Sequence, residues 1–287
     1  MSDPRPSTST GTGTPQDLTD RRVLVPGGTG AVGEGIVRAY LAAGAVVVVP
    51  TRTPERAEQF RGVLGAAATD RLHLVVHDYT TFAGAADLAA QMVASLGGVD
   101  DVVAPIGGWW AGGALAAIDE TDWQDAFVGL ATAHAAVMRA CLPLLGGRGA
   151  YTVVVGDSAS TPVPDSGLVS MEQAAVLMMT RVLAAEAAGR QRVFALVLGP
   201  VRTRLAAGAP NGGSADQVSA DQVSAERVSA DQVGAVAVAA SAATTVTGRQ
   251  IVVHDRAEVD RALALLAAAA PAGTGAADGV DTRSATA

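Results

Sequence analysis

Short runs of apolar, mostly β-branched residues alternate with longer Ala-rich stretches through the middle of the chain. Apolar runs without polar alternation are typical of strands that are buried on both faces of a sheet. Seven such runs predict strands at Arg22–Pro26, Ala45–Thr51, Leu72–Asp78, Asp100–Ile106, Tyr151–Gly156, Arg192–Leu198 and Gln250–Val253.

The stretches between these runs have the length and composition of helices. Helices are predicted at Ala31–Ala43, Pro54–Leu64, Ala83–Leu96, Asp122–Leu145, Leu168–Ala188, Ala230–Ala240 and Arg256–Ala269. Because strands and helices alternate, right-handed crossovers would join parallel strands and cover both faces of their sheet. The pattern predicts an α/β fold, a Rossmann-type doubly wound and mostly parallel sheet of seven strands in a single domain. Ligands of such sheets bind beyond the carboxyl ends of the strands.

Both ends of the chain are rich in small polar residues, Pro and Gly, with few large apolar groups to offset ordering entropy. We predict disordered tails at 1–20 and 271–287, which leaves one domain at 21–270. A repeated SADQV motif at about 206–229 predicts a low-complexity insertion in an exposed loop, since a period of five matches neither helix nor strand. In its last copy, Ser229 and Gln232 have the spacing of a capping box and predict the start of a helix.

The composition of the chain indicates which kinds of binding partner and which cellular compartment to expect. The net charge of −8 argues against nucleic-acid and anionic-membrane surfaces, which need clustered basic residues. Cys141 is the only cysteine, so an internal disulfide is impossible and a reducing compartment is expected. Without an apolar signal or spanning segment, we expect a cytoplasmic protein that binds a small-molecule ligand or substrate. No His, Cys, Asp and Glu cluster has metal-ligand spacing, so we expect no metal.

The strongest motif joins the first strand to the first helix and reads Gly27-Gly28-Thr29-Gly30-Ala31-Val32-Gly33. Glycines spaced three apart allow a tight turn and a close approach of backbone to a pyrophosphate, which the N-terminus of the helix attracts. A cofactor would contact Gly27, Gly28, Thr29, Gly30, Val32 and Gly33. The alternative is a purely structural Gly-rich turn.

Two strand ends bear on the choice of cofactor. Arg52 follows the second strand, where an acid would bind a ribose 2′-hydroxyl and an Arg suits a 2′-phosphate, so NADP(H) is favoured over NAD(H). Arg56 offers a second contact. Asp78 ends the third strand and is placed either to bind the adenine amino group or to cap the helix that follows.

These features together resemble the short-chain dehydrogenase/reductase family from about Arg22 to Val253. The resemblance rests on the Gly-rich turn, Arg52, Asp78 and three further segments at Ala174–Glu186, Arg192–Thr203 and Val246–Val253. It implies cofactor contacts at Gly107, in the loop after the fourth strand, and at Thr203. It also implies a homo-oligomer, a dimer or tetramer, formed by the helices at Asp122–Leu145 and Leu168–Ala188.

The catalytic positions depart from the family pattern. Alignment on Ala174–Glu186 places the family's Lys at Gln173, its Tyr at Val169 and its Ser at Gly156, while its helical Asn falls at Leu130. Val cannot transfer a proton and Gln carries no positive charge. Conventional proton-coupled hydride transfer is therefore not expected, and the catalytic residues are unknown.

Other residues offer substitutes or structural roles. Trp109 and Trp110 could form an aromatic wall or lid over the substrate pocket, or pack into the core. Ser158 could bind a carbonyl or simply form a turn. We expect His134 on a helix surface or interface. The acidic residues Asp119, Glu120 and Asp122 form a helix N-terminus.

Three functions remain open from the sequence. The first is an NADP(H)-binding oxidoreductase of this family with atypical or lost conventional catalysis. The second is a non-catalytic nucleotide- or ligand-binding or sensing protein. The third is a non-redox isomerase or cyclase that reuses the pocket. The fold alone does not choose among them.

Overall fold

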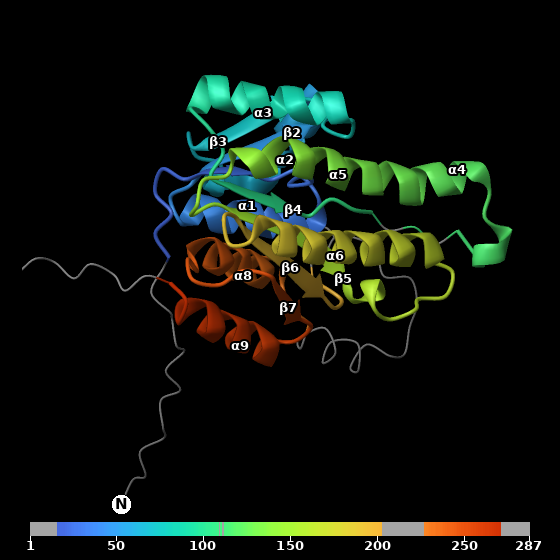
Figure 1. Cartoon of the computed structure of the whole chain (residues 1–287). Helices are drawn as coiled ribbons and strands as arrows, with labels where there is room; N and C mark the ends of the chain where they lie inside the picture. The colour runs from blue at the N-terminus through green and yellow to red at the C-terminus, as the bar shows by residue number, and fades with distance from the viewer. Residues whose placement is uncertain (1–15, 109, 111, 203–226, 271–287) are drawn as a thin grey trace, which may run out of the picture.

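The computed structural model describes residues 16–108, 110, 112–202 and 227–270. Its centre is a seven-stranded sheet in the order β3-β2-β1-β4-β5-β6-β7 (Figure 1). All neighbouring strands are parallel. The strands are β1 (Arg22–Leu24), β2 (Val46–Thr51), β3 (Leu72–Val76), β4 (Asp101–Ala104), β5 (Ala150–Gly156), β6 (Arg192–Leu198) and β7 (Arg249–Val253).

Helices cover both faces of the sheet. The α-helices are α1 (Ala31–Ala42), α2 (Pro54–Leu64), α3 (Phe82–Leu96), α4 (Glu120–Trp123), α5 (Gly129–Cys141), α6 (Gly167–Ala187), α8 (Ala230–Ala242) and α9 (Arg256–Ala267). Apolar residues of α1, α2, α8 and α9 share one core cluster, and those of α3, α5 and α6 share another. The chain therefore winds to one face, then to the other, and β1 and β4 meet at the switch point.

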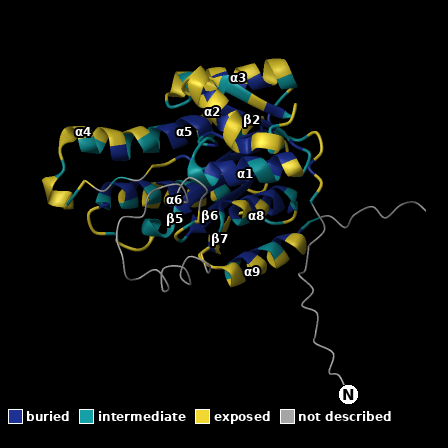
Figure 2. Cartoon of the chain, turned by 180° about the vertical axis from the view of Figure 1, so that it is seen from behind, coloured by how far each residue is buried: buried dark blue, intermediate teal, exposed yellow. Residues whose placement is uncertain are grey.

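The predicted architecture is confirmed, and the boundaries differ by only a few residues except at one helix. The helix predicted at Asp122–Leu145 begins at Glu120 and is divided by a π-helical segment, η3 (Gln124–Val128), before α5. Figure 1 shows α4, α5 and α6 extending beyond the sheet on one side. Figure 2 shows a buried sheet and α1, with exposed outer surfaces on α2, α3 and α9.

The start of the domain corrects the predicted tail. Leu18 lies within the segment 1–20 that was expected to be disordered, yet it is buried at 3% exposure. Its backbone N–H donates to the Ala43 carbonyl oxygen at 2.9 Å. Leu18 is a single apolar residue among polar ones and gives no periodic signal, so the sequence pattern does not reveal that residues 16–20 pack against the domain.

The packing of α1 against α8 requires glycines on both helices. A methyl group on Gly35 would overlap the backbone of Ala230, and one on Gly234 would overlap the Gly35 carbonyl. Ser229 Oγ accepts a hydrogen bond from Gln232 N–H at 3.2 Å, and Gln232 Oε1 accepts one from Ser229 N–H at 2.8 Å. This confirms the predicted capping box and fixes the start of α8 beside α1.

Candidate functional site

The Gly-rich turn lies at the carboxyl end of β1, beside the switch point. Gly27 has a φ of +84°, a conformation that L side chains rarely adopt, and a methyl group there would overlap the Pro105 carbonyl. On Gly33 a methyl group would lie 2.5 Å from the Gly27 carbonyl oxygen and 2.7 Å from the Gly28 Cα. The glycines are thus required for this close approach of α1 to the turn.

The resulting cradle fits the pyrophosphate of a dinucleotide. Gly30 is the N-cap of α1, a helix of twelve residues, and has no side chain to cap it. The first backbone N–H groups of α1 therefore face the turn without a side-chain acceptor. Unpaired N–H groups and the helix dipole favour an anionic ligand. The turn can therefore hold a diphosphate, which agrees with the sequence-based expectation for this segment.

The rim beside the turn contains Arg52, Asp78 and Tyr79. Arg52 is exposed after β2, and within the described residues its side chain makes no hydrogen bond or ion pair. Asp78 accepts hydrogen bonds from Thr80 N–H at 2.9 Å and Thr80 Oγ1 at 2.6 Å, which lower its pKa. The cap of α3 is Thr81, so the suggestion that Asp78 caps this helix is wrong.

Tyr79 is a rim residue that sequence reasoning missed. Burial raises the pKa of its hydroxyl, and a backbone hydrogen bond from Gly27 opposes that shift. The side chain therefore reaches from the end of β3 to the first glycine of the turn. Its position directly after Asp78 was the only available signal.

Arg56 lines a small cavity between α1 and α2. The cavity has a volume of about 110 Å³ and is also lined by Thr29, Glu34, Gln59, Phe60 and Val63. Arg56 Nη2 donates to the Thr29 carbonyl oxygen at 3.3 Å, while Glu34 is neutralised by Arg38 at 2.6 Å. Arg52 and Arg56 thus place two guanidinium groups near one side of the turn.

The positions aligned with the family's catalytic residues lie in a corner formed by the end of β5 and the start of α6. Gln173 Oε1 accepts one hydrogen bond from Gly156 N–H at 2.9 Å and another from Ser158 Oγ at 2.6 Å. A methyl group on Gly156 would lie 2.9 Å from Gln173 Oε1. Val169, one turn earlier on α6, is 4% exposed. Glycine at the position of the family's Ser therefore leaves room for the Gln173 carbonyl.

The whole chain lacks the group that a Lys would supply here. All 20 of its basic residues are Arg, so it contains no lysine. It has three tyrosines: Tyr40 and Tyr151 are fully buried elsewhere, and Tyr79 lies against Gly27. Neither a phenol nor an ammonium group is found at this corner.

A buried acid and a buried imidazole lie behind the loop that follows β4. His134 of α5 and Glu172 of α6 are each 1% exposed, which corrects the expectation that His134 lies on a surface. His134 Nε2 is 3.0 Å from the Ile106 carbonyl oxygen and 3.7 Å from Glu172 Oε1. Burial lowers the pKa of His134 to about 4 and raises that of Glu172 to about 7. Both groups favour their neutral forms.

The loop between β4 and α4 connects the aromatic residues to α4. Trp110 Nε1 donates to Asp122 Oδ1 at 3.2 Å, and Asp122 also belongs to the Asp119 capping box, which confirms the predicted helix start. Gly107 is exposed at the near end of this loop. The predicted contacts Trp109 and Thr203 lie outside the described residues.

Among the described residues, no group of three or more His, Cys, Asp and Glu side chains could hold a metal ion. Two helical stretches, Glu120–Leu144 and Gly167–Ala187, are long and apolar enough to cross a membrane by length and composition alone. Both pack partly against the sheet, and core helices of soluble proteins share these properties, so this is weak evidence for a membrane span.

Comparison with known proteins identifies relatives. A family model described as enoyl-(acyl carrier protein) reductase matches residues 28–255. An uncharacterized oxidoreductase of Mycobacterium tuberculosis (strain CDC 1551 / Oshkosh) is 31% identical over 193 residues, which span 65% of this chain and 71% of the relative.

Solved structures agree in fold. A short-chain type dehydrogenase/reductase from Mycobacterium ulcerans is 25% identical, with a TM-score of 0.72 over 83% of this chain and 90% of the other. A short chain oxidoreductase from Pseudomonas aeruginosa PAO1, described as containing an atypical catalytic center, is 22% identical, with a TM-score of 0.70 over 83% and 97% of the two chains.

Proposed function

Because this chain belongs to the short-chain dehydrogenase/reductase family, we propose that it is an oxidoreductase that binds NADP(H) and works without the family's usual Tyr and Lys. Family members use nicotinamide cofactors and act on small molecules. The reduced cofactor supplies a hydride when it is bound. The pyrophosphate is held by the Gly27–Gly33 turn, with Gly107 and Thr203 as further contacts.

The observation that carries the preference for NADP(H) is Arg52. Its guanidinium is exposed at the end of β2, makes no hydrogen bond or ion pair among the described residues, and lies close enough to Asp78 and Tyr79 for its charge to favour their ionised forms. Arg56 lies near the same side of the turn. A planar guanidinium binds a phosphate through two parallel hydrogen bonds, which an NAD ribose does not offer. Asp78 and Tyr79 complete the adenine side of the site.

The experiment is a titration of the purified protein with NADPH and NADH, followed by Trp fluorescence and thermal stabilisation. We expect Arg52→Ala to weaken NADPH binding at least tenfold, which is about 1.4 kcal/mol, and to leave NADH binding unchanged. Arg61→Ala, an exposed Arg of α2 away from the rim, is the matched control. Equal loss for both cofactors would contradict the role of Arg52. If neither cofactor bound to the parent protein, a sensing or non-redox role would replace this proposal.

The proposed assembly rests on the same family membership, whereas the proposed location rests on the chain's cysteine content. We propose a homo-oligomer, a dimer or tetramer, formed by α5 and α6, because Met171, Met178 and Val182 leave exposed apolar side chains along α6. A cytoplasmic location agrees with Cys141, a free and buried thiol.

A further inference from the structure

The Ser158 hydroxyl has its hydrogen committed to Gln173. Gly156 N–H can only donate, so it fixes the oxygen end of the Gln173 amide toward β5. Ser158 Oγ lies 2.6 Å from that same oxygen, and a carbonyl oxygen can only accept. Ser158 must therefore donate to Gln173. Toward a ligand it presents lone pairs, the opposite polarity from a serine that donates to a substrate carbonyl.

The described segment from Gly156 to Thr180, which forms the corner around Ser158, contains no Tyr, Lys or Arg. Val169 is apolar, Gly156 has no side chain, and the segment from Ala150 to Thr180 contains three acidic residues and neither Lys nor Arg. His134 and Glu172 are buried beneath Ile106 rather than exposed at the corner. The chain as a whole carries a net charge of −8. These features disfavour a developing alkoxide and favour a cationic ligand.

We infer that the substrate is an iminium ion, a protonated imine that brings its own proton and donates its N–H to Ser158 Oγ. This inference rests on the proposed binding of NADP(H). Hydride addition to a carbonyl leaves an alkoxide that must acquire a proton. Hydride addition to an iminium carbon breaks one C–H bond of the dihydronicotinamide and forms one on the substrate. The C=N π electrons become a nitrogen lone pair, so a neutral amine and NADP⁺ result without proton transfer from the protein.

The test compares two fused bicyclic substrates of similar size. Dihydroisoquinoline supplies a protonatable imine within its ring and tetralone supplies a ketone whose oxygen lies outside the ring, and turnover is followed by the loss of NADPH absorbance. We expect the imine to be reduced, at a rate that rises with its protonated fraction, and tetralone to be inert. Reduction of tetralone, or failure to reduce either compound by protein that binds NADPH, would overturn the inference while the cofactor proposal stands. Failure to bind NADPH would instead remove the proposed function.

Variants test the role of the serine lone pairs. Ser158→Ala should raise KM for protonated dihydroisoquinoline at least tenfold and change KM for N-methyl-dihydroisoquinolinium, which has no N–H, by less than threefold. Ser160→Ala, an exposed serine of the same loop, is the matched control. Ser158→Thr retains the hydroxyl and should restore activity. An equal effect of Ser158→Ala on both cations would contradict a hydrogen bond to the substrate nitrogen.

The reciprocal experiment restores the family pair with Val169→Tyr and Gln173→Lys. Lys cannot accept the Ser158 hydrogen, and it adds a cation, so imine reduction should fall at least tenfold while tetralone becomes a substrate. Circular dichroism checks that the variant is folded, since Val169 is buried. A folded variant that still preferred the imine would count against the inference, and Ser158→Ala decides the matter if the double variant does not fold.

Discussion

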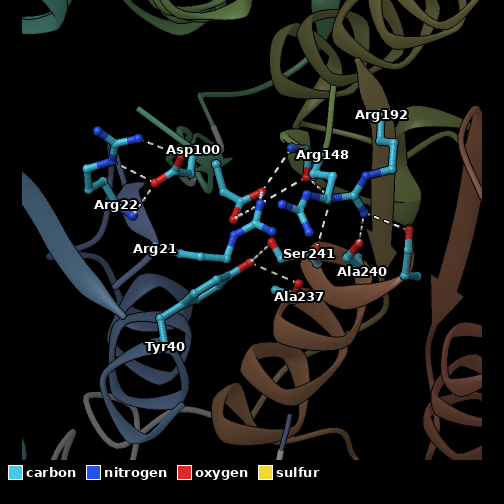
Figure 3. A network of polar contacts seen from close by, with 12 residues as sticks. Arg21, Arg22, Tyr40, Asp100, Arg148, Arg192, Ala237, Ala240 and Ser241 are labelled. Carbon is cyan, nitrogen blue, oxygen red and sulfur yellow. Dashed lines mark hydrogen bonds and ion pairs between the residues drawn. The ribbon is translucent and has the colours of Figure 1, made fainter. Parts of the chain in front are cut away.

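The two ends of the sheet are built in opposite ways. At the amino ends of the strands, Arg192 is 3% exposed and donates to the carbonyl oxygens of Arg148, Ala240, Ser241 and Ala243 (Figure 3). At the carboxyl ends, the turn depends on missing side chains, and Arg52 is exposed. Polar side chains at the first end bond mainly to one another and to backbone carbonyls, although Arg21 Nε and Arg192 Nε have no hydrogen-bond partner among the described residues, whereas Arg52 at the second end is exposed.

The amino end joins distant parts of the chain. Arg21 forms an ion pair with the fully buried Asp101 at 2.7 Å, and Asp101 also accepts from Ala150 N–H at 2.9 Å. Tyr40 of α1 reaches Ser241 of α8 at 2.6 Å. The fold is therefore secured at the end opposite the Gly-rich turn. Residues at the carboxyl end can change, as Val169 and Gln173 have relative to the family, without loss of the architecture.

The largest expected effect is that of Arg192→Met, which tests whether the amino-end network stabilises the fold. The variant removes this donor from the carbonyl oxygens of Ala240, Ser241 and Ala243 at the C-terminal end of α8, whereas the Arg148 carbonyl oxygen still accepts from Arg21 Nη2 at 3.0 Å. We expect a loss of about 4 kcal/mol in the free energy of unfolding, measured with denaturant. Arg190→Met is the control. The Arg190 side chain is exposed and, among the described residues, donates only to the Glu186 carbonyl oxygen, so this change should alter stability by less than about 0.5 kcal/mol. Equal effects would show that the amino-end network does not carry the stability.

Local signals were enough to predict most of the architecture. The apolar runs located every strand, and Ser229 with Gln232 located the start of α8 because a capping box is defined within four residues. The Gly27–Gly33 turn was equally local. Such features depend on neighbours in sequence, so one chain suffices to detect them.

Features that depend on tertiary contact were missed. Arg192 has the composition of a strand start, and nothing in the sequence tells that its guanidinium meets carbonyls 48 to 51 residues away. His134 was expected on a helix surface or interface because its Ala-rich helix resembles one that packs between subunits in the family, yet it is buried beside Glu172. The sharing of Gln173 Oε1 by Gly156 and Ser158 also follows only from the approach of α6 to β5.

A second prediction concerns the pair behind the carboxyl-end loop. Burial raises the pKa of Glu172 to about 7, so its contribution to stability is full below its unfolded pKa and is lost as the pH rises toward 7. Burial lowers the pKa of His134 to about 4, so its contribution is full above its unfolded pKa and is lost as the pH falls toward 4. The two contributions therefore change the free energy of unfolding with pH in opposite directions. They largely cancel at pH values between the unfolded pKa values of the two groups.

Glu172→Gln should remove the Glu172 contribution, so that, of this pair, His134 alone contributes to the pH dependence of the free energy of unfolding. Denaturant unfolding of the parent and the variant across this pH range should show the parent gaining about 3 kcal/mol relative to the variant as the pH falls through the pKa of Glu172. Glu186→Gln, an exposed change on the same helix, should leave the pH profile parallel to that of the parent. A Glu172→Gln profile parallel to the parent would show that Glu172 is ionised in the folded protein.

The smallest expected effect is that of Gly33→Ala, which should separate ligand binding at the carboxyl end from stability at the amino end. Gly33→Ala places a methyl group 2.5 Å from the Gly27 carbonyl oxygen, so the turn must open and its N–H groups must move. We expect NADPH to bind at least tenfold more weakly, about 1.4 kcal/mol, with a smaller loss of stability because the amino-end network is untouched. Gly62→Ala is the matched control: it lies in α2 with open space around it and should stabilise the fold by less than about 1 kcal/mol without changing NADPH binding. If Gly33→Ala lowered stability as much as Arg192→Met, the two ends would not differ in the way proposed, because the turn would then support the fold as well as the ligand.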